Sequence, residues 1–261
     1  MNRRKFLQAG LALGSTAFLN AVPLSTFSTP GGERRDGGSY KPGEKISQEA
    51  FVSDKQLNHH KIVDLCQADP EAALNLLYIY GGGALSNSER LGGIWCPDSF
   101  EDLYVVRFVH LKYPSEVQII PVACPPVYSS QYYGLEERVF LDEPADSEKF
   151  KKAVQRFIAS TEKVVSGRLL PVETYYDFRF RLLFNRREDL LPDKNYGTIY
   201  PWQGKFRAED ETQKYGTPTI WLLDRDGVVL TEPFHGNFYH SDPFELSYSA
   251  VDVDQAIQQF L

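Results

Sequence analysis

Two apolar runs with a segment of helical spacing between them limit what this chain can fold into. Residues 73–80 form a short, nearly continuous apolar run that ends in Gly81-Gly82-Gly83, a pattern typical of a buried central strand. Residues 117–123 form a second such run. Between them, residues 97–113 carry apolar side chains at the three- and four-residue spacing of a helix. Strand, helix and strand in this order predict a right-handed parallel crossover and an α/β fold.

The predicted helix between these strands begins beside a cysteine, Cys96. Pro97 suits the first turn of a helix, and Asp98 or Ser99 can serve as its N-cap. A thiol at this position lies near unpaired amides and the positive end of the helix dipole, and both stabilise a thiolate. Cys96 is therefore a candidate nucleophile, and a buried, inert cysteine is the alternative. Asp98 could oppose the thiolate by charge repulsion or could carry a proton for it.

Other elements follow from spacing and turn signals. Helices are predicted over about 53–67 and 147–166, and a closing helix capped by Asp252 would place Ile257, Phe260 and Leu261 on one face. Residues 220–223 and 228–230 are two apolar runs joined by Asp226-Gly227, which predicts a β-hairpin. Residues 234–240 are interpreted as a polar loop.

The N-terminus has the pattern of an export signal. Arg3 and Arg4 precede Phe6-Leu7 and a moderately apolar stretch that extends to about residue 22. The pattern resembles a bacterial twin-arginine signal over residues 1–24, which implies a periplasmic or other extracytoplasmic location. An uncut anchor or a basic cytosolic helix are the alternatives. Residues 25–45 are rich in Gly, Pro, Ser, Thr and charge and predict a flexible linker, so the folded domain is expected over 46–261.

The bulk composition excludes some classes of function. The chain has 261 residues and a net charge of −7, which argues against nucleic acid or an anionic membrane surface as its main partner. With 42% hydrophobic residues it has the composition of an ordinary globular protein. Three cysteines are too few for a disulfide framework. The five histidines are too scattered for a metal signature, and no metal or organic cofactor is expected.

The order of the motifs resembles the thioredoxin-like superfamily. The matching elements are the strand at 73–80, the Trp95-Cys96-Pro97-Asp98 motif, the helix and strand that follow, the Gly216-Thr217-Pro218-Thr219 segment and the Asp226-Gly227 turn. The resemblance implies a three-layer α/β sandwich with a mixed central sheet, and residues of about 125–205 exceed what that fold needs and are interpreted as an insertion. It also implies that Pro218 is a cis-proline facing the thiol, that the backbone of Thr217 meets a bound partner, and that Trp95 shields the sulfur.

The sequence departs from the family pattern at one position. The second cysteine of a two-cysteine site is Ser99 here, so Cys96 cannot close the usual short disulfide. Ser99 could donate a hydrogen bond to the thiolate or only cap the helix. Cys96 could instead form mixed disulfides with other molecules, could pair with Cys124 at the end of the next strand, or could have lost its redox role. Cys66 is expected to be a packed, small apolar residue.

Three functions remain open at this point. The first is thiol–disulfide exchange through Cys96 with a protein partner or a low-molecular-weight thiol. The second is a redox-inactive module that binds an extended peptide or a partner protein. The third and weakest is a peroxidase, because Gly93 stands where peroxidases of this superfamily place a Thr or Ser. The sequence does not identify the substrate, the electron donor or the oligomeric state.

Overall fold

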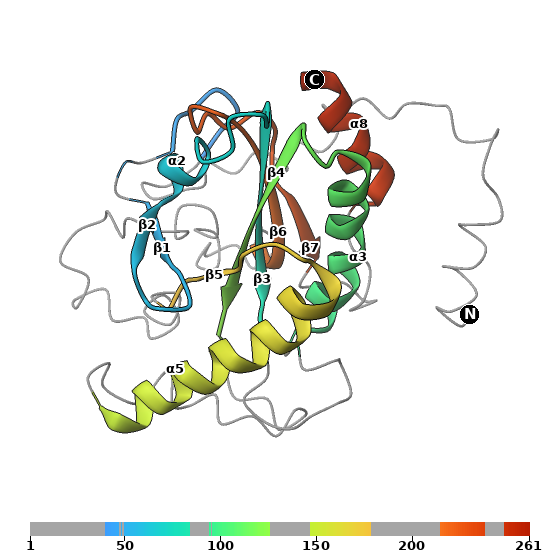
Figure 1. Ribbon diagram of the computed structural model, residues 1–261. Helices are drawn as coiled ribbons and strands as arrows, with labels where there is room; N and C mark the ends of the chain where they lie inside the picture. The colour runs from blue at the N-terminus through green and yellow to red at the C-terminus, as the bar shows by residue number, and fades with distance from the viewer. Residues whose placement is uncertain are drawn as a thin grey trace, which may run out of the picture. The chain divides into compact units, whose positions relative to one another are not determined.

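One mixed sheet organises the computed structural model, which describes residues 40–46, 48, 50–83, 94, 96–125, 147–178, 215–237 and 248–261. Within these residues the sheet has seven strands in the order β2-β1-β5-β4-β3-β6-β7 (Figure 1). The strands are β1 (Phe51–Ser53), β2 (His59–Lys61), β3 (Leu74–Gly81), β4 (Val117–Cys124), β5 (Tyr175–Tyr176), β6 (Tyr215–Asp224) and β7 (Phe234–Asn237). The described residues all belong to one unit, Glu33–Leu261.

The centre of the sheet is the predicted parallel crossover. All eight residues of β3 are buried, and β4 pairs with β3 in parallel from Leu74↔Val117 to Gly81↔Cys124. The helix α3 (Pro97–Lys112) connects the two strands. Strand β6 pairs with the other side of β3 in antiparallel orientation, and β7 extends the sheet beyond β6. This arrangement, with two parallel central strands followed by two antiparallel ones and a closing helix, confirms the predicted α/β fold with a thioredoxin-like mixed sheet.

Alternation along the strands divides the core into two clusters. On one face, Leu74, Leu76, Tyr78 and Tyr80 of β3 pack with buried residues of α3, of α5 (Glu148–Thr161) and of α8 (Ala250–Phe260). We call this the helix face. On the other, Leu77 and Ile79 pack with the short helix α2 (Ile62–Leu65) and with residues 46–52. We call this the opposite face. Three layers result, as expected.

The helices that cover the helix face have clear end signals. The side chain of Ser147 accepts a hydrogen bond from the Phe150 N–H at the start of α5. Ser249 and Asp252 form a reciprocal capping box at the start of α8. The N-cap of α8 is thus Ser249 and not Asp252, which is the third helical residue. Phe260 and Leu261 are exposed, and the buried residues of α8 are Val253, Ala256 and Ile257.

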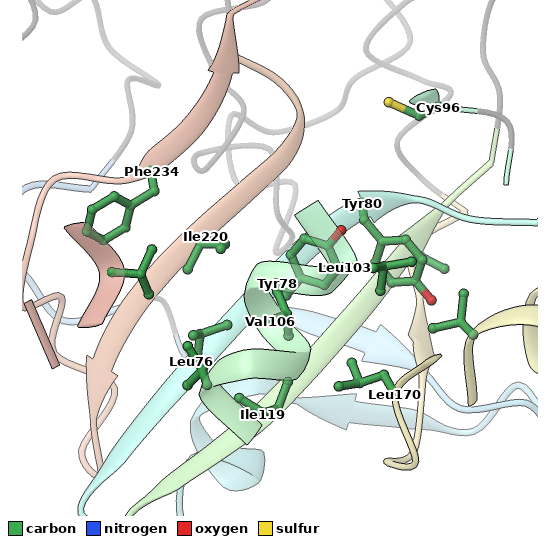
Figure 2. Close-up of a cluster of buried hydrophobic side chains, with 14 of the residues drawn as sticks. Leu76, Tyr78, Tyr80, Cys96, Leu103, Val106, Ile119, Leu170, Ile220 and Phe234 are labelled. Atoms are coloured by element: carbon green, nitrogen blue, oxygen red, sulfur yellow. The ribbon is translucent and has the colours of Figure 1, made fainter. Parts of the chain in front are cut away.

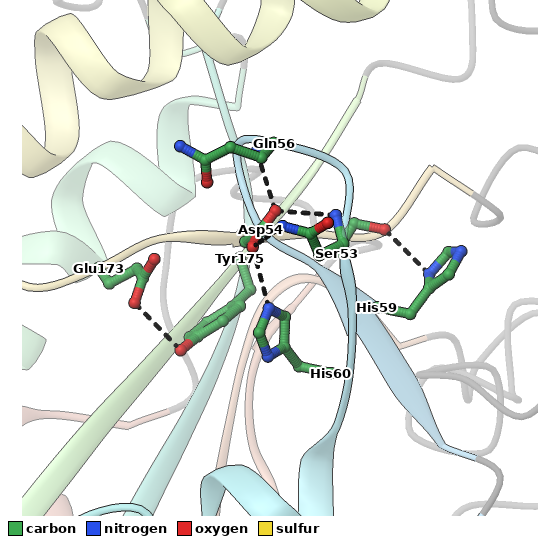
Figure 3. A network of polar contacts seen from close by, with 8 residues as sticks. Ser53, Asp54, Gln56, His59, His60, Glu173 and Tyr175 are labelled. Atoms are coloured by element: carbon green, nitrogen blue, oxygen red, sulfur yellow. Dashed lines mark hydrogen bonds and ion pairs between the residues drawn. The ribbon is translucent and has the colours of Figure 1, made fainter.

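A hairpin replaces the predicted helix over 53–67. Strands β1 and β2 pair in antiparallel orientation, and only the one turn of α2 is helical. Asp54 explains the difference: its Oδ1 accepts hydrogen bonds from the N–H groups of Gln56 and Asn58 at 2.8 and 2.9 Å (Figure 3). Asn, Asp and similar side chains compete with helix formation in this way. Leu57 completes the turn with a φ of +68°.

The predicted C-terminal hairpin is present, with a short second strand after the turn. Gly227 has a φ of +75° and its N–H donates to the carbonyl of Asp224, as an Asp-Gly turn requires. Val229 forms an antiparallel bridge with Leu223, and backbone hydrogen bonds join Asp224 to Val228 and Leu230 to Leu222. The neighbour of β6 in the sheet is β7, within the segment predicted to be a polar loop.

The helix predicted over 147–166 consists of two parts. The α-helix α5 ends at Thr161, and a π-helix, η3 (Glu162–Leu169), continues from it. Both lie within the range interpreted as an insertion, and residues 147–178 of that range contribute α5 and β5 to the fold. The predicted signal and most of the predicted linker lie outside the described residues. Among the helices that are described, none is long and apolar enough to cross a membrane.

Candidate functional site

Cys96 occupies the N-cap of α3. Its backbone is extended, with φ −99° and ψ 115°, and its carbonyl accepts the first helical hydrogen bond from Phe100 at 3.2 Å. Pro97 follows as the first residue of the helix, as predicted, whereas the predicted caps Asp98 and Ser99 lie inside it. The Cys96 side chain is 6% exposed and belongs to the cluster of the helix face. Figure 2 shows it above the rings of Tyr78 and Tyr80.

Ser99 connects the first turn of α3 to the end of β3. Its Oγ accepts a hydrogen bond from the Gly81 N–H at 2.9 Å, and its carbonyl accepts one from the Tyr78 hydroxyl at 2.9 Å. The residue is fully buried. The hydroxyl at position 99 therefore satisfies a strand amide that would otherwise be buried without an acceptor, which is a reason for serine here that sequence reasoning missed.

Buried polar groups lie beside the first two turns of α3. Tyr78 stacks on Tyr80 with ring centroids 4.9 Å apart. The Tyr248 hydroxyl donates to Oδ1 of Asp102 at 2.5 Å, and Asp102 is fully buried. Burial, together with the nearby Asp102, Tyr248, Tyr80 and Cys96, raises the pKa of Tyr78 well above its ordinary value. The hydroxyl of Tyr78 therefore stays protonated and serves as a donor at any physiological pH.

The two other cysteines lie on the opposite face of the sheet. Cys124 ends β4 beside Gly81, at the same sheet edge as Cys96, but its side chain belongs to the other apolar cluster. None of the three cysteines forms a disulfide. The structure thus brings Cys124 to the predicted edge without placing it in the cluster that holds Cys96. Its role as a resolving cysteine stays a prediction.

Cys66 is remote from both. The Asn75 side chain donates to the carbonyls of Cys66 and Asp224 at 3.1 Å each, which fixes Cys66 near the start of β3. Cys124 pairs with the last residue of that strand, seven positions further, or roughly 23 Å at the rise of a strand. Burial, with a contribution from Asp224, raises the pKa of Cys66 to about 12. Cys66 is fully buried, as the sequence predicted for a packed residue.

Pro218 lies at the same edge as Cys96. It is buried and precedes Thr219, which pairs with Ile79 two residues before the end of β3. The cis conformation expected at Pro218 stays a prediction. Trp95 lies outside the described residues, as do the side chains of Asp98 and Thr217.

The glycines after β3 have a packing role. A Cβ on Gly82 would lie 2.6 Å from Cζ of Phe157 and 2.9 Å from Cβ of Ala123. A Cβ on Gly83 would lie 2.7 Å from the carbonyl carbon of Ser160. The end of β3 therefore runs directly against α5, which only residues without a side chain allow. Among the described residues, no three His, Cys, Asp or Glu side chains are grouped so that they could hold a metal ion.

Comparisons with known proteins add similarities of fold at low identity. No protein-family model matches the sequence. No curated protein matches it either. A hypothetical protein from Sinorhizobium meliloti is 12% identical over 85% of this chain and 87% of its own, with a TM-score of 0.42. The exposed lipoprotein thioredoxin Etrx1 of Streptococcus pneumoniae is 11% identical over 80% and 97%, with a TM-score of 0.38. A thiol peroxidase from Chromobacterium violaceum is 13% identical over 85% and 89%, with a TM-score of 0.40.

Proposed function

We propose that this protein carries out thiol–disulfide exchange through a single nucleophilic cysteine, Cys96. The observation that supports it is the place of Cys96 at the N-cap of a sixteen-residue helix. Amides without helical partners and the helix dipole favour a thiolate there. The thiolate attacks one sulfur of a partner disulfide, the other sulfur leaves as a thiolate, and a mixed disulfide remains. A second thiol, from the partner or a small molecule, attacks the mixed disulfide and releases Cys96.

The other residues of the site have supporting roles in this proposal. Ser99 and Tyr78 fix the first turn of α3 against β3, which holds the amides in place for the sulfur. Trp95, Pro218 and the backbone of Thr217 form the contact surface for the partner, and Asp98 tunes the charge near the thiolate. Cys124 is the candidate for an internal resolving thiol, and its side chain would have to leave its own cluster to reach Cys96.

A second candidate is a binding module without exchange. The burial of Cys96, at 6% exposure, favours it, because a sulfur that a disulfide cannot reach does not react. In that case the sheet edge near Pro218 would bind an extended peptide or a partner protein through its backbone and apolar groups.

The rate of Cys96 alkylation as a function of pH separates these candidates. The folded protein is treated with iodoacetamide between pH 5 and 10, and peptide mass spectrometry identifies which cysteine is modified. Exchange predicts that Cys96 reacts first, with a titration midpoint below ~8.5, the value of an unperturbed thiol. A midpoint at or above that value with slow modification defeats the exchange proposal and leaves the binding module.

We also propose that residues 1–24 direct export by a twin-arginine route. The adjacent Arg3 and Arg4 ahead of Phe6-Leu7 support it. Replacing both arginines by lysine keeps the charge and removes the twin-arginine pattern. Cell fractionation of a bacterial host should then find the variant in the cytoplasm and the unaltered chain outside it. Equal distribution of the two proteins contradicts this proposal.

A further inference from the structure

The chain that leads to Cys96 is held at Gly83. Gly83 forms an antiparallel bridge with Ile94, two residues before Cys96. The position of Gly83 therefore determines where Ile94 lies, and with it the entry of the chain into α3. The Ile94 side chain is buried in the helix-face cluster together with Cys96, so the two share one environment.

Thr161 holds Gly83 from the other side. The Gly83 N–H donates to Oγ1 of Thr161 at 2.8 Å, and the Thr161 hydroxyl donates to the carbonyl of Phe157 at 2.9 Å. Thr161 is fully buried. Because the hydroxyl donates to its own helix, its lone pairs have a fixed direction, and they accept the Gly83 amide, two residues after the end of β3.

The surrounding backbone makes this contact close and specific. Thr161 is the last residue of α5, and the π-helix η3 begins at Glu162. A π-helix changes the hydrogen-bond register, and such changes are frequent at functional sites. The lack of a side chain on Gly83 lets its backbone touch this junction, since a Cβ there would collide with the backbone of Ser160 and Thr161.

We propose that Thr161 is a positioning residue for the Cys96 thiol. Two hydroxyls on two helices bind the amides at the end of β3: Ser99 of α3 binds that of Gly81, and Thr161 of α5 binds that of Gly83. The first holds the start of the reactive helix, and the second holds the chain that enters it. This inference rests on the proposed function, because it concerns how the nucleophile is held against the first turn of α3.

A purely structural threonine would behave differently from a positioning one. Losing a buried hydroxyl lowers the stability of the protein in either case, because the Gly83 N–H loses its acceptor. Only a positioning role also changes the titration of Cys96. If Gly83 and Ile94 shift, the sulfur moves away from the helix amides and its thiolate loses their stabilisation.

The test compares Thr161→Val with Thr161→Ser in the full chain. Valine keeps the shape and removes the hydroxyl, whereas serine keeps the hydroxyl. The readout is the pH profile of Cys96 alkylation, identified by peptide mass spectrometry. Thr161→Val should move the midpoint upward by about one pH unit, which lowers the alkylation rate at pH 7 roughly tenfold. Thr161→Ser should keep the midpoint of the unaltered protein.

A matched control destabilises the same helix at its other end. Ser147→Ala removes the N-cap of α5, whose side chain accepts from the Phe150 N–H, far along the helix from Thr161. It should lower the melting temperature and leave the Cys96 midpoint unchanged. If Thr161→Val does not fold, Thr161→Ala is measured in its place, because it removes the same hydroxyl and reduces crowding.

The outcomes distinguish the two proposals. A low midpoint in the unaltered protein that Thr161→Val or Thr161→Ala leaves in place overturns the positioning role and keeps the exchange proposal. The same holds if Ser147→Ala raises the midpoint as much as they do. A midpoint at or above ~8.5 in the unaltered protein overturns both proposals.

Discussion

Both faces of the central sheet bury apolar side chains, and they differ in the kind of polar group among them. On the helix face, Ser99, Asp102 and Thr161 are fully buried, and the hydroxyls of Tyr78 and Tyr248 bind partners there. On the opposite face, aliphatic and aromatic residues surround Cys66 and Cys124, and a buried amide, that of Asn75, binds the backbone carbonyls of Cys66 and Asp224. The chain thus places the same side chain, a thiol, in two chemical surroundings. We expect these surroundings to decide which cysteine reacts.

The reactivity of the three thiols is the strongest test of this contrast. With a pKa of about 12, Cys66 is a thiolate in about one molecule in ten thousand at pH 8. Native-state alkylation at pH 8, read by peptide mass spectrometry, should leave Cys66 unmodified while Cys96 reacts. In guanidinium chloride all three should react at similar rates. Modification of Cys66 before Cys96 in the folded protein breaks the contrast.

Adjacent leucines on β3 test whether the faces differ in packing as well. Leu76 packs on the helix face and Leu77 on the opposite face, and both are fully buried. Leu76→Ala and Leu77→Ala should each lower the free energy of unfolding by about 2–5 kcal/mol, through lost burial and a cavity. Urea denaturation measures both. Similar losses of unfolding free energy mean that the two faces are packed alike and differ only in their polar groups. A loss in only one of the two variants contradicts this.

A substitution at the close contact between the end of β3 and α5 should have a smaller effect on the free energy of unfolding. Gly83→Ala should lower the free energy of unfolding by about 3 kcal/mol, because the new methyl group would collide with the backbone of α5. The matched variant is Gly43→Ala, where nothing lies within 4 Å and only the φ of +86° opposes the change. It should cost about 1 kcal/mol. Denaturation curves with equal losses for both variants would show that the approach at Gly83 is not tight.

The smallest expected effect is on the stability of the protein at low pH. It comes from Asp54 in the hairpin of β1 and β2. Burial raises the pKa of Asp54, but hydrogen bonds from His60, Asn58 and Gln56 outweigh it and lower this pKa from 3.8 to about 2 (Figure 3). A carboxyl whose pKa falls on folding stabilises the protein above its unfolded pKa. That contribution should disappear as the pH falls from about 4 through about 2. Denaturation as a function of pH should show a shallower acid loss for Asp54→Asn, and an unchanged slope contradicts this.

The elements that the sequence predicted well are those with a regular apolar pattern. Strands β3 and β4 and helix α3 have long apolar patterns with glycine or proline at their ends, and these patterns determine them locally. The helix predicted over 53–67 was wrong because one side chain, Asp54, decides the turn there. The structural roles of the Ser99 and Thr161 hydroxyls could not be predicted, because a buried hydroxyl produces no periodic pattern in the sequence. Their partners are amides 18 and 78 positions away, which become neighbours only in the folded chain.

The hydrogen bond between Tyr248 and Asp102 can form only late in the synthesis of the chain. It joins residues 146 positions apart, and the tyrosine lies only thirteen residues before the last residue, Leu261. A chain still being synthesised can form β3, α3 and β4 while the Asp102 carboxyl lacks this tyrosine. The helix that carries Cys96 therefore reaches its final surroundings only after Tyr248 has been made. The surroundings of the proposed site therefore depend on a residue that is synthesised long after the site itself.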